Sequence, residues 1–192
     1  KKYQDGVIVA PEGRSEIDES LINDAMEAVK SFEDGMEKME ISNVIKAVWG
    51  FISRANKYID ETAPWALAKD ETKKQELANV MYNLTESLRI ISALVSPFIP
   101  ATAEKVWKQL NIEGEFANVR LSDIKAWGGT PAGMTVGTPE QLFPRIELED
   151  KKSDKEAAKK AAAEAKAAKK AKREAQKAME AAKRAAAEAN KE

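Results

Sequence analysis

Three long segments carry apolar residues at intervals of three and four, and this spacing constrains the fold more than any other feature of the chain. Such intervals place apolar side chains along one face of an α-helix, which can then pack against a core. We predict helices over about 20–40, 42–61 and 72–96, with Asp18 or Ser20 as the first cap. The stripes that define them are Leu21, Ile22, Ala25, Ala28 and Val29; Val44, Val48, Phe51, Ile52, Ala55, Tyr58 and Ile59; and Leu77, Val80, Met81, Leu84, Leu88, Ile91 and Val95.

Prolines bound these helices. The residue before a proline is disfavoured in helical conformation, so the second helix should end by Ala63. Pro64 then suits the first turn of a short helix over 64–69. Two later prolines end the third helix, and Thr102 can cap a further helix over 102–110. The chain is therefore expected to be all-α.

The rest of the chain has two different characters. Glycines and prolines break any helix over 111–147, so this irregular segment has to pack on the helices, with Phe143 and Ile146 as its expected anchors. From Ser153 to Asn190 the residues are almost all Ala, Lys, Glu and Arg, which predicts a long solvated helix that acts as a semi-rigid spacer. We accordingly divide the chain into a bundle with its C-terminal segment, 1–148, and a tail, 149–192.

Composition excludes several kinds of function. The chain has no cysteine and no histidine, which removes disulfides, thiolate metal sites and every Ser-His or Cys-His nucleophile. We therefore predict no catalytic residue and no metal site. No apolar run reaches the roughly 18 residues of a membrane span, and no signal peptide opens the chain. A cytoplasmic protein without a membrane partner is the expectation.

Charge is distributed unevenly. Residues 151–192 carry 14 Lys and Arg against 7 Asp and Glu, whereas residues 1–150 carry 17 against 25. A basic helix can hold RNA phosphates without reading sequence, and it can equally be a spacer to a further C-terminal domain; we weigh these two roles equally. The candidate backbone-binding residues are Lys159, Lys160, Lys166, Lys169, Lys170 and Arg173.

Several runs resemble one known family. Residues 54–65 (RANKYIDETAPW) look like the signature of the anticodon-binding domain of methionyl-tRNA synthetases. Residues 80–107, beginning VMYNLTESLRI, and the run from Trp127-Gly128-Gly129 to Phe-Pro-Arg-Ile at 143–146 are similar to later parts of that domain. The opening Lys2-Tyr-Gln-Asp-Gly6 also resembles the family. The resemblance implies a class I synthetase-type helical bundle with an irregular C-terminal segment, followed here by the solvated tail.

The resemblance also implies what the parent protein does. The family uses ATP and Mg to attach methionine to its tRNA, on a catalytic domain with motifs that this sequence does not contain, the first of which requires histidine. We expect a piece without cofactors of its own, whose partners are tRNA and the catalytic domain of the same enzyme. The family also uses an Asn and an Arg on a helix before the Lys-Tyr-x-Asp-Gly stretch; that helix has no counterpart here, so these positions are not carried over.

The candidate RNA site centres on one tryptophan. Unpaired bases stack on exposed, rigidly held rings, and Trp65 follows Pro64, which fixes the backbone at that point. The resemblance assigns Trp65 this role, although most tryptophans are mainly buried and the ring could instead be a lid on the bundle. Asn56 can bond a base edge, Arg54 can hold phosphate, and Asp60 can accept from a base amino group. Asn56 and Arg54 could also be part of an ordinary solvated helix face, and Asp60 could equally bond the free amides near Pro64.

An alternative function stays open at this point. The acidic body favours a non-enzymatic helical module that binds a protein, with the basic tail as a spacer.

Overall fold

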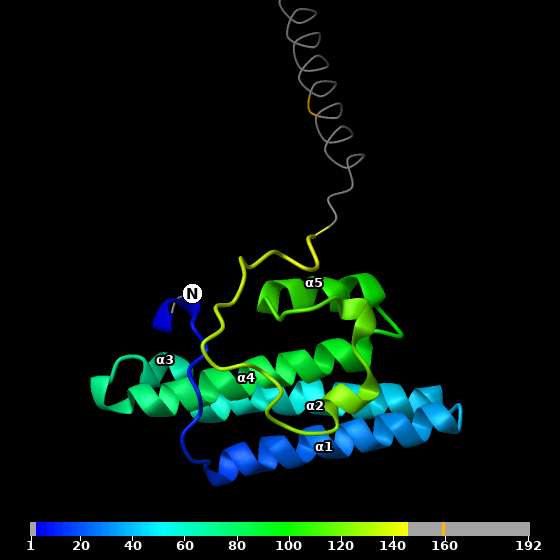
Figure 1. The fold of residues 1–192 in the computed structure, drawn as a ribbon, viewed down its shortest axis with the longest axis horizontal. Coiled ribbons are helices and arrows are strands. Elements are labelled where there is room, and N and C mark those ends of the chain that lie inside the picture. The colour runs from blue at the N-terminus through cyan, green and yellow to red at the C-terminus, as the bar shows by residue number, and fades with distance from the viewer. Residues whose placement is uncertain (1–2, 146–158, 160–192) are drawn as a thin grey trace, which may run out of the picture. The chain divides into compact units, whose positions relative to one another are not determined.

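The computed structural model describes residues 3–145 and Lys159, and Figure 1 shows their arrangement. The chain divides into two compact units, Lys1–Leu142 and Phe143–Glu192, and nearly all described residues belong to the first. The boundary that we predict after residue 148 lies outside the described residues, as does the tail apart from Lys159, so both stay predictions. The elements are η1 (Gln4–Gly6), α1 (Glu16–Glu37), α2 (Ile41–Thr62), α3 (Pro64–Leu67), η2 (Glu71–Lys73), α4 (Lys74–Val95), α5 (Pro100–Leu110), η3 (Phe116–Asn118) and η4 (Leu121–Ile124).

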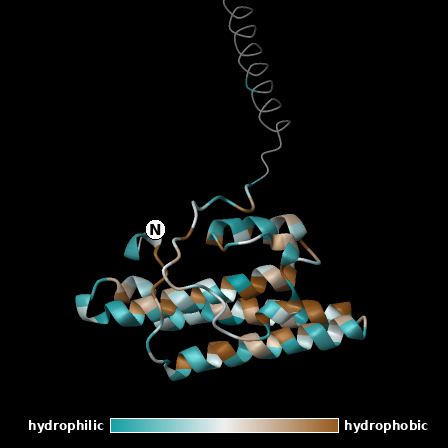
Figure 2. Cartoon of the chain, in the orientation of Figure 1, coloured by the Kyte–Doolittle hydropathy of each residue, from teal (hydrophilic) through white to brown (hydrophobic). Residues whose placement is uncertain are grey.

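The helices α1, α2 and α4 lie side by side, and α5 packs on α4 (Figure 1). Apolar and polar residues alternate along the helices, as the colouring of Figure 2 shows, and the buried apolar residues form one core. The core between the three long helices contains Leu21, Val44, Phe51, Tyr58, Ile90 and Leu94, all at most 2% exposed. The predicted all-α fold is confirmed, since the described residues contain only an isolated bridge between Val7 and Thr135 in place of a sheet. No helix among them is long and apolar enough to cross a bilayer.

The start of α1 differs from the prediction. Its N-cap is Ser15, whose hydroxyl accepts from the Asp18 amide at 3.2 Å, while the Asp18 carboxylate accepts from the Ser15 amide at 2.7 Å. Asp18 is thus the third residue of a capping box, and neither it nor Ser20 is the cap. Helix α1 accordingly begins at Glu16.

Two further predictions about the later helices are wrong. Helix α5 begins at Pro100, so Thr102 lies inside the first turn and does not cap it. Leu88 was assigned to the buried stripe of α4, yet it is 45% exposed. Proline suits the first helical position because its φ is already helical and it has no N–H to leave unpaired, and the Thr102 and Ala103 amides donate to the Ile99 carbonyl at 3.1 and 3.0 Å.

The irregular segment after α5 is anchored differently from our expectation. Phe143 is 70% exposed, so it is not an anchor, and Ile146 lies outside the described residues. Ile124 is 1% exposed and Trp127 packs partly buried against the core, which makes these the apolar anchors. Backbone bonds also tie the segment to the N-terminus: the Ile8 amide donates to Met134 at 2.8 Å.

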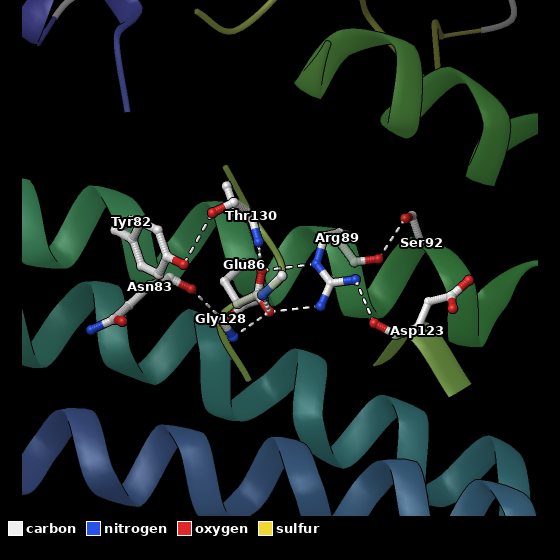
Figure 3. A network of polar contacts seen from close by, with 10 residues as sticks. Tyr82, Asn83, Glu86, Arg89, Ser92, Asp123, Gly128 and Thr130 are labelled. Atoms are coloured by element: carbon white, nitrogen blue, oxygen red, sulfur yellow. Dashed lines mark hydrogen bonds and ion pairs between the residues drawn. The ribbon is translucent and has the colours of Figure 1, made fainter. Parts of the chain in front are cut away.

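A buried carboxylate fixes the central part of this segment (Figure 3). Glu86 on α4 is fully buried and forms a two-pronged ion pair with Arg89, at 2.7 and 2.8 Å. The same carboxylate accepts the amides of Gly128, Gly129 and Thr130 at 2.9 to 3.0 Å, and the Thr130 hydroxyl at 2.5 Å. We call this group of five residues the Glu86 clamp.

The clamp explains a glycine of the segment. A Cβ at position 129 would lie 2.6 Å from the Arg89 guanidinium carbon, so any side chain there would displace the buried ion pair. Burial alone would raise the pKa of Glu86, but the hydrogen bonds and charge of Arg89, with those of Thr130 and Gly129, hold it below its ordinary value. Glu86 is therefore ionised inside the fold.

Candidate nucleic-acid interface

A tight corner joins α2 to α3 and presents Trp65. Helix α2 ends at Thr62, as Pro64 predicts, and Ala63 adopts a left-handed conformation with φ 41° and ψ 62°. The Ala63 amide still donates to Ile59 at 3.0 Å, and the Ala63 carbonyl accepts the Ala66 amide at 2.7 Å. A left-handed alanine costs about 1–2 kcal/mol, so the surrounding contacts have to hold this conformation.

The contacts that hold the corner come from the neighbours of Trp65. Pro64 and Leu67 are both buried, and α3 packs on α4. Trp65 lies between these two anchors with 50% of its surface exposed. The ring is therefore not a lid on the bundle: it lies at a bend between two buried residues, with half of its surface open to solvent.

Asn56 and Asp60 lie on α2 just before the corner. Both are exposed, and their separation of four residues places them on one side of the helix. Trp49, about two helical turns before Asn56 on the same side, is 51% exposed. A carboxamide and a carboxylate thus lie on the outer side of α2 next to the corner, and Trp49 lies further from the corner on that side.

Arg54 lies elsewhere. Its guanidinium pairs with Asp24 of α1 at 3.1 Å and with Glu61 at 2.9 Å, and donates to the Ile17 carbonyl at 3.3 Å. The side chain is only 13% exposed and faces α1. The structure therefore does not bring Arg54 together with Asn56 and Asp60, and its charge already has two partners.

Glu61 links this ion-pair group to the end of α2. Its partial desolvation would raise the pKa, but hydrogen bonds from Lys57 and Arg54 hold the pKa of Glu61 below its ordinary value. The Lys57 ammonium lies 3.3 Å from the carboxylate and is otherwise exposed. Lys57 is thus a cation near the corner with 70% of its side chain exposed.

A second buried polar group lies beneath the corner. The Tyr58 hydroxyl donates to Asp18 at 2.5 Å, and the Asn83 amide donates to Asp18 at 2.9 Å and to the Tyr58 oxygen at 3.0 Å. These three residues, the Asp18 triad, connect α1, α2 and α4. Burial, together with the neighbouring Asp18 carboxylate, raises the pKa of Tyr58, so its hydroxyl stays protonated. Sequence reasoning placed Tyr58 in an apolar stripe and missed its partners.

The remaining predicted residues lie in the tail. Lys159 is helical and exposed. Lys160, Lys166, Lys169, Lys170 and Arg173 lie outside the described residues. Within the described part of the chain, no three Asp or Glu residues gather in a way that could hold a metal ion.

Comparisons with known proteins agree on one family. A family model described as the anticodon binding domain of methionyl tRNA ligase matches residues 10–165. The methionine–tRNA ligase of Clostridium tetani is 47% identical over 151 residues, which are 79% of this chain and 23% of that protein. The Bacillus subtilis enzyme is 46% identical over 156 residues, covering 78% of this chain and 22% of the enzyme.

A solved structure shows the same fold. The crystal structure of the apo form of Mycobacterium tuberculosis methionyl-tRNA synthetase superposes with a TM-score of 0.67 at 25% identity, over 77% of this chain and 29% of that one. The chain thus spans about a quarter of the length of the proteins that it matches. Because the family model covers most of the sequence and the bundle has the same architecture, this chain belongs to the anticodon-binding domain family of the methionyl-tRNA ligases.

Proposed function

We propose that this chain reads the anticodon of a methionine tRNA as part of a methionyl-tRNA synthetase, and that Trp65 stacks on an unpaired anticodon base. The observation that carries the proposal is the half-exposed ring held between two buried anchors. A base gains about 1–3 kcal/mol by stacking on such a ring, and a preformed site loses little of this to ordering the protein. The family and the relatives' names support the choice of tRNA.

Asn56 and Asp60 are the proposed readers of base edges. They occupy the exposed side of α2 that leads to the corner, where a base next to the stacked one could lie. A carboxamide offers both a donor and an acceptor, whereas an ionised carboxylate accepts only and repels a base edge that presents acceptors. Pro64 supports the ring, and Arg54 acts indirectly by fixing α2 against α1.

Phosphate binding needs cations that the bundle itself hardly provides, because residues 1–150 have eight more acidic than basic residues. We propose that the basic tail contributes non-specific affinity, and that a further domain beyond it is the alternative use of that spacer. The parent's reaction with ATP and Mg belongs to its catalytic domain, which is the second proposed partner of this chain. The proposed location is the cytoplasm.

The test compares two equally exposed tryptophans. Affinity for the anticodon stem-loop of a methionine tRNA is measured by fluorescence anisotropy for the full chain, for Trp65→Ala and for Trp49→Ala. Trp65→Ala is expected to weaken binding by about 1–3 kcal/mol, roughly 5- to 150-fold, while Trp65→Phe keeps most of the affinity. Trp49→Ala is the matched control, since that ring is 51% exposed, and its affinity should be unchanged.

Two results would contradict the proposal. Unchanged affinity of Trp65→Ala would remove this ring from the site. Equal affinity for a stem-loop with its three anticodon bases replaced would favour the protein-interaction module. Deletion of residues 151–192 tests the tail separately: it should weaken binding of any RNA and flatten the dependence of affinity on salt.

A further inference from the structure

A cavity opens where the chain passes from α4 into α5. Helix α4 ends at Val95, α5 begins at Pro100, and residues of η3 and η4 also line the space beside this turn. The cavity has a volume of about 640 Å³, within the range of about 300–1,000 Å³ that is typical of small-molecule sites. It lies at the C-terminal end of α4, whereas α3 with Trp65 leads into the N-terminal end, so no residue of the proposed RNA site lines it.

The lining of this cavity is mainly apolar. Phe32 of α1 belongs to the core, and Phe116 of η3 and Leu121 of η4 pack against that core while they line the cavity. Pro97 and Pro100 form another part of the wall and have no backbone N–H to offer a ligand. The cavity therefore favours a ligand with an apolar body.

Three charged residues line the cavity as well: Glu104, Glu115 and Arg120. Glu104 already pairs with Lys108 at 2.6 Å. Among the residues that the structure describes, Glu115 and Arg120 form no ion pair with each other or with any third residue. The Arg120 guanidinium has only a long contact of 3.5 Å with the Ala117 carbonyl. One carboxylate and one guanidinium thus line an apolar cavity without a partner of opposite charge.

We propose that this cavity binds a small zwitterion with an apolar body, which is the chemistry of a free apolar α-amino acid or of a short apolar peptide. The ammonium group of the ligand pairs with Glu115, its carboxylate pairs with Arg120, and its apolar side chain packs on Phe32 and Leu121. A ligand with a single charge would leave one of the two charged residues unpaired beside an apolar surface, so the cavity discriminates against it. The proposal is independent of RNA binding.

Trp107 supplies a spectroscopic signal for this cavity. Its ring centre lies 5.4 Å from that of Phe116, and its buried indole N–H has no acceptor in the described part of the chain. A ligand that contacts Phe116 should therefore shift the indole signal of Trp107 in ¹H–¹⁵N spectra. The indole signals of Trp49 and Trp65, which lie on α2 and α3, should stay in place and serve as internal controls.

The test is a titration of the full chain without RNA, with L-leucine and with the dipeptide leucyl-leucine. At least one of them should saturate the Trp107 shift with a dissociation constant on the order of 1 mM, because partly solvated ion pairs contribute modestly. The tighter of the two shows whether the ligand is a free amino acid or a short peptide. The methyl ester of that ligand lacks the negative charge and its N-acetyl form lacks the positive charge, so each should bind at least about fivefold more weakly.

Two variants connect each charge of the ligand to one residue. In Arg120→Gln, the zwitterion should bind no better than its methyl ester, and in Glu115→Gln it should bind no better than its N-acetyl form. A purely structural role of either residue would weaken all ligands alike and would leave these differences in place. Glu113→Gln is the matched control, because Glu113 is an exposed acid two residues before Glu115 that does not line the cavity, and the titration should be unchanged.

Three outcomes would overturn the proposal. The first is a Trp107 signal that neither L-leucine nor leucyl-leucine shifts. The second is equal binding of the zwitterion, its methyl ester and its N-acetyl form, which would mean that the cavity recognises only an apolar body. The third is discrimination between these forms that persists in both Arg120→Gln and Glu115→Gln, since the charges would then be recognised elsewhere.

Discussion

Replacement of Glu86 by glutamine keeps the shape of the side chain and removes its charge. In the Glu86 clamp, one carboxylate oxygen accepts from an Arg89 NH₂ group, Gly128 and Gly129, and the other accepts from the Arg89 Nε, the Thr130 amide and the Thr130 hydroxyl. Glutamine can reproduce only one of these oxygens. Its NH₂ group has to face the donors of the other.

The size of the effect follows from the donors left over. The least costly orientation keeps the amide oxygen toward Gly128 and Gly129, and the Thr130 hydroxyl can turn to accept from the new NH₂ group. The Arg89 Nε and the Thr130 amide then face hydrogen atoms, and the guanidinium of Arg89, a side chain only 4% exposed, has lost its counter-charge. An unpaired buried donor costs about 1–3 kcal/mol, and loss of one member of a buried ion pair costs about 3–5 kcal/mol in total. We expect the free energy of unfolding to fall by about 3–5 kcal/mol.

The measurement is urea unfolding followed by tryptophan fluorescence. Glu104→Gln is the matched control: it breaks an exposed ion pair with Lys108 within one helix and should cost about 0.5 kcal/mol or less. A loss below about 1 kcal/mol for Glu86→Gln would refute the reasoning, because it would mean that the carboxylate contributes no more than a surface charge.

Three other predictions rest on the same buried groups. The folded pKa of Glu86 lies below its unfolded value, so the stability that its charge contributes is fully present above the ordinary pKa of 4.5. This stability is lost as the pH falls through the folded pKa. The urea midpoint should therefore decline below about pH 4.5, and it should decline less in Glu86→Gln. Gly129→Ala drives a Cβ into Arg89 and should cost about 1–3 kcal/mol in the same assay, whereas Gly50→Ala, at an open helical position, should stabilise slightly. Tyr58→Phe removes the hydroxyl that donates to Asp18 and should lower the free energy of unfolding by about 1–3 kcal/mol. An unchanged free energy of unfolding would argue against the bond at 2.5 Å.

The helices could be predicted from sequence because their signals are local. The expected span of 42–61 differs from α2 by one residue at each end, since the apolar spacing defines the face and Pro64 defines the stop. The first residue of α1 was missed because Ser15 and Asp18 are both good caps, and only the reciprocal bonds of the capping box distinguish them. Local patterns thus define a helix better than they define its ends.

The buried polar groups could not be predicted in the same way. Glu86 binds amides more than forty residues away, and Asp18 binds Asn83 sixty-five residues away, so no spacing rule connects them. Periodicity places Glu86 on α4 but does not show that a loop covers that side of the helix. The exposure of Trp65 has a similar origin, because burial of Pro64 and Leu67 against α4 determines which way the ring faces.

The two buried polar groups hold the segment around Gly128 and the corner at Ala63, neither of which has the apolar repeat of a helix. The segment around Gly128 has few apolar side chains, so apolar packing alone would let it lie on α4 in several alignments. The Glu86 carboxylate accepts three consecutive amides, those of Gly128, Gly129 and Thr130, and so selects one alignment. The Asp18 triad similarly joins the start of α1 to the end of α2, close to the left-handed Ala63 that turns the chain toward Trp65. A corner that stores backbone strain holds one conformation only if the helices beneath it cannot shift. The fixed position that the exposed ring requires therefore rests on two kinds of contact: the burial of Pro64 and Leu67 against α4, and the hydrogen bonds of the Asp18 triad between the helices.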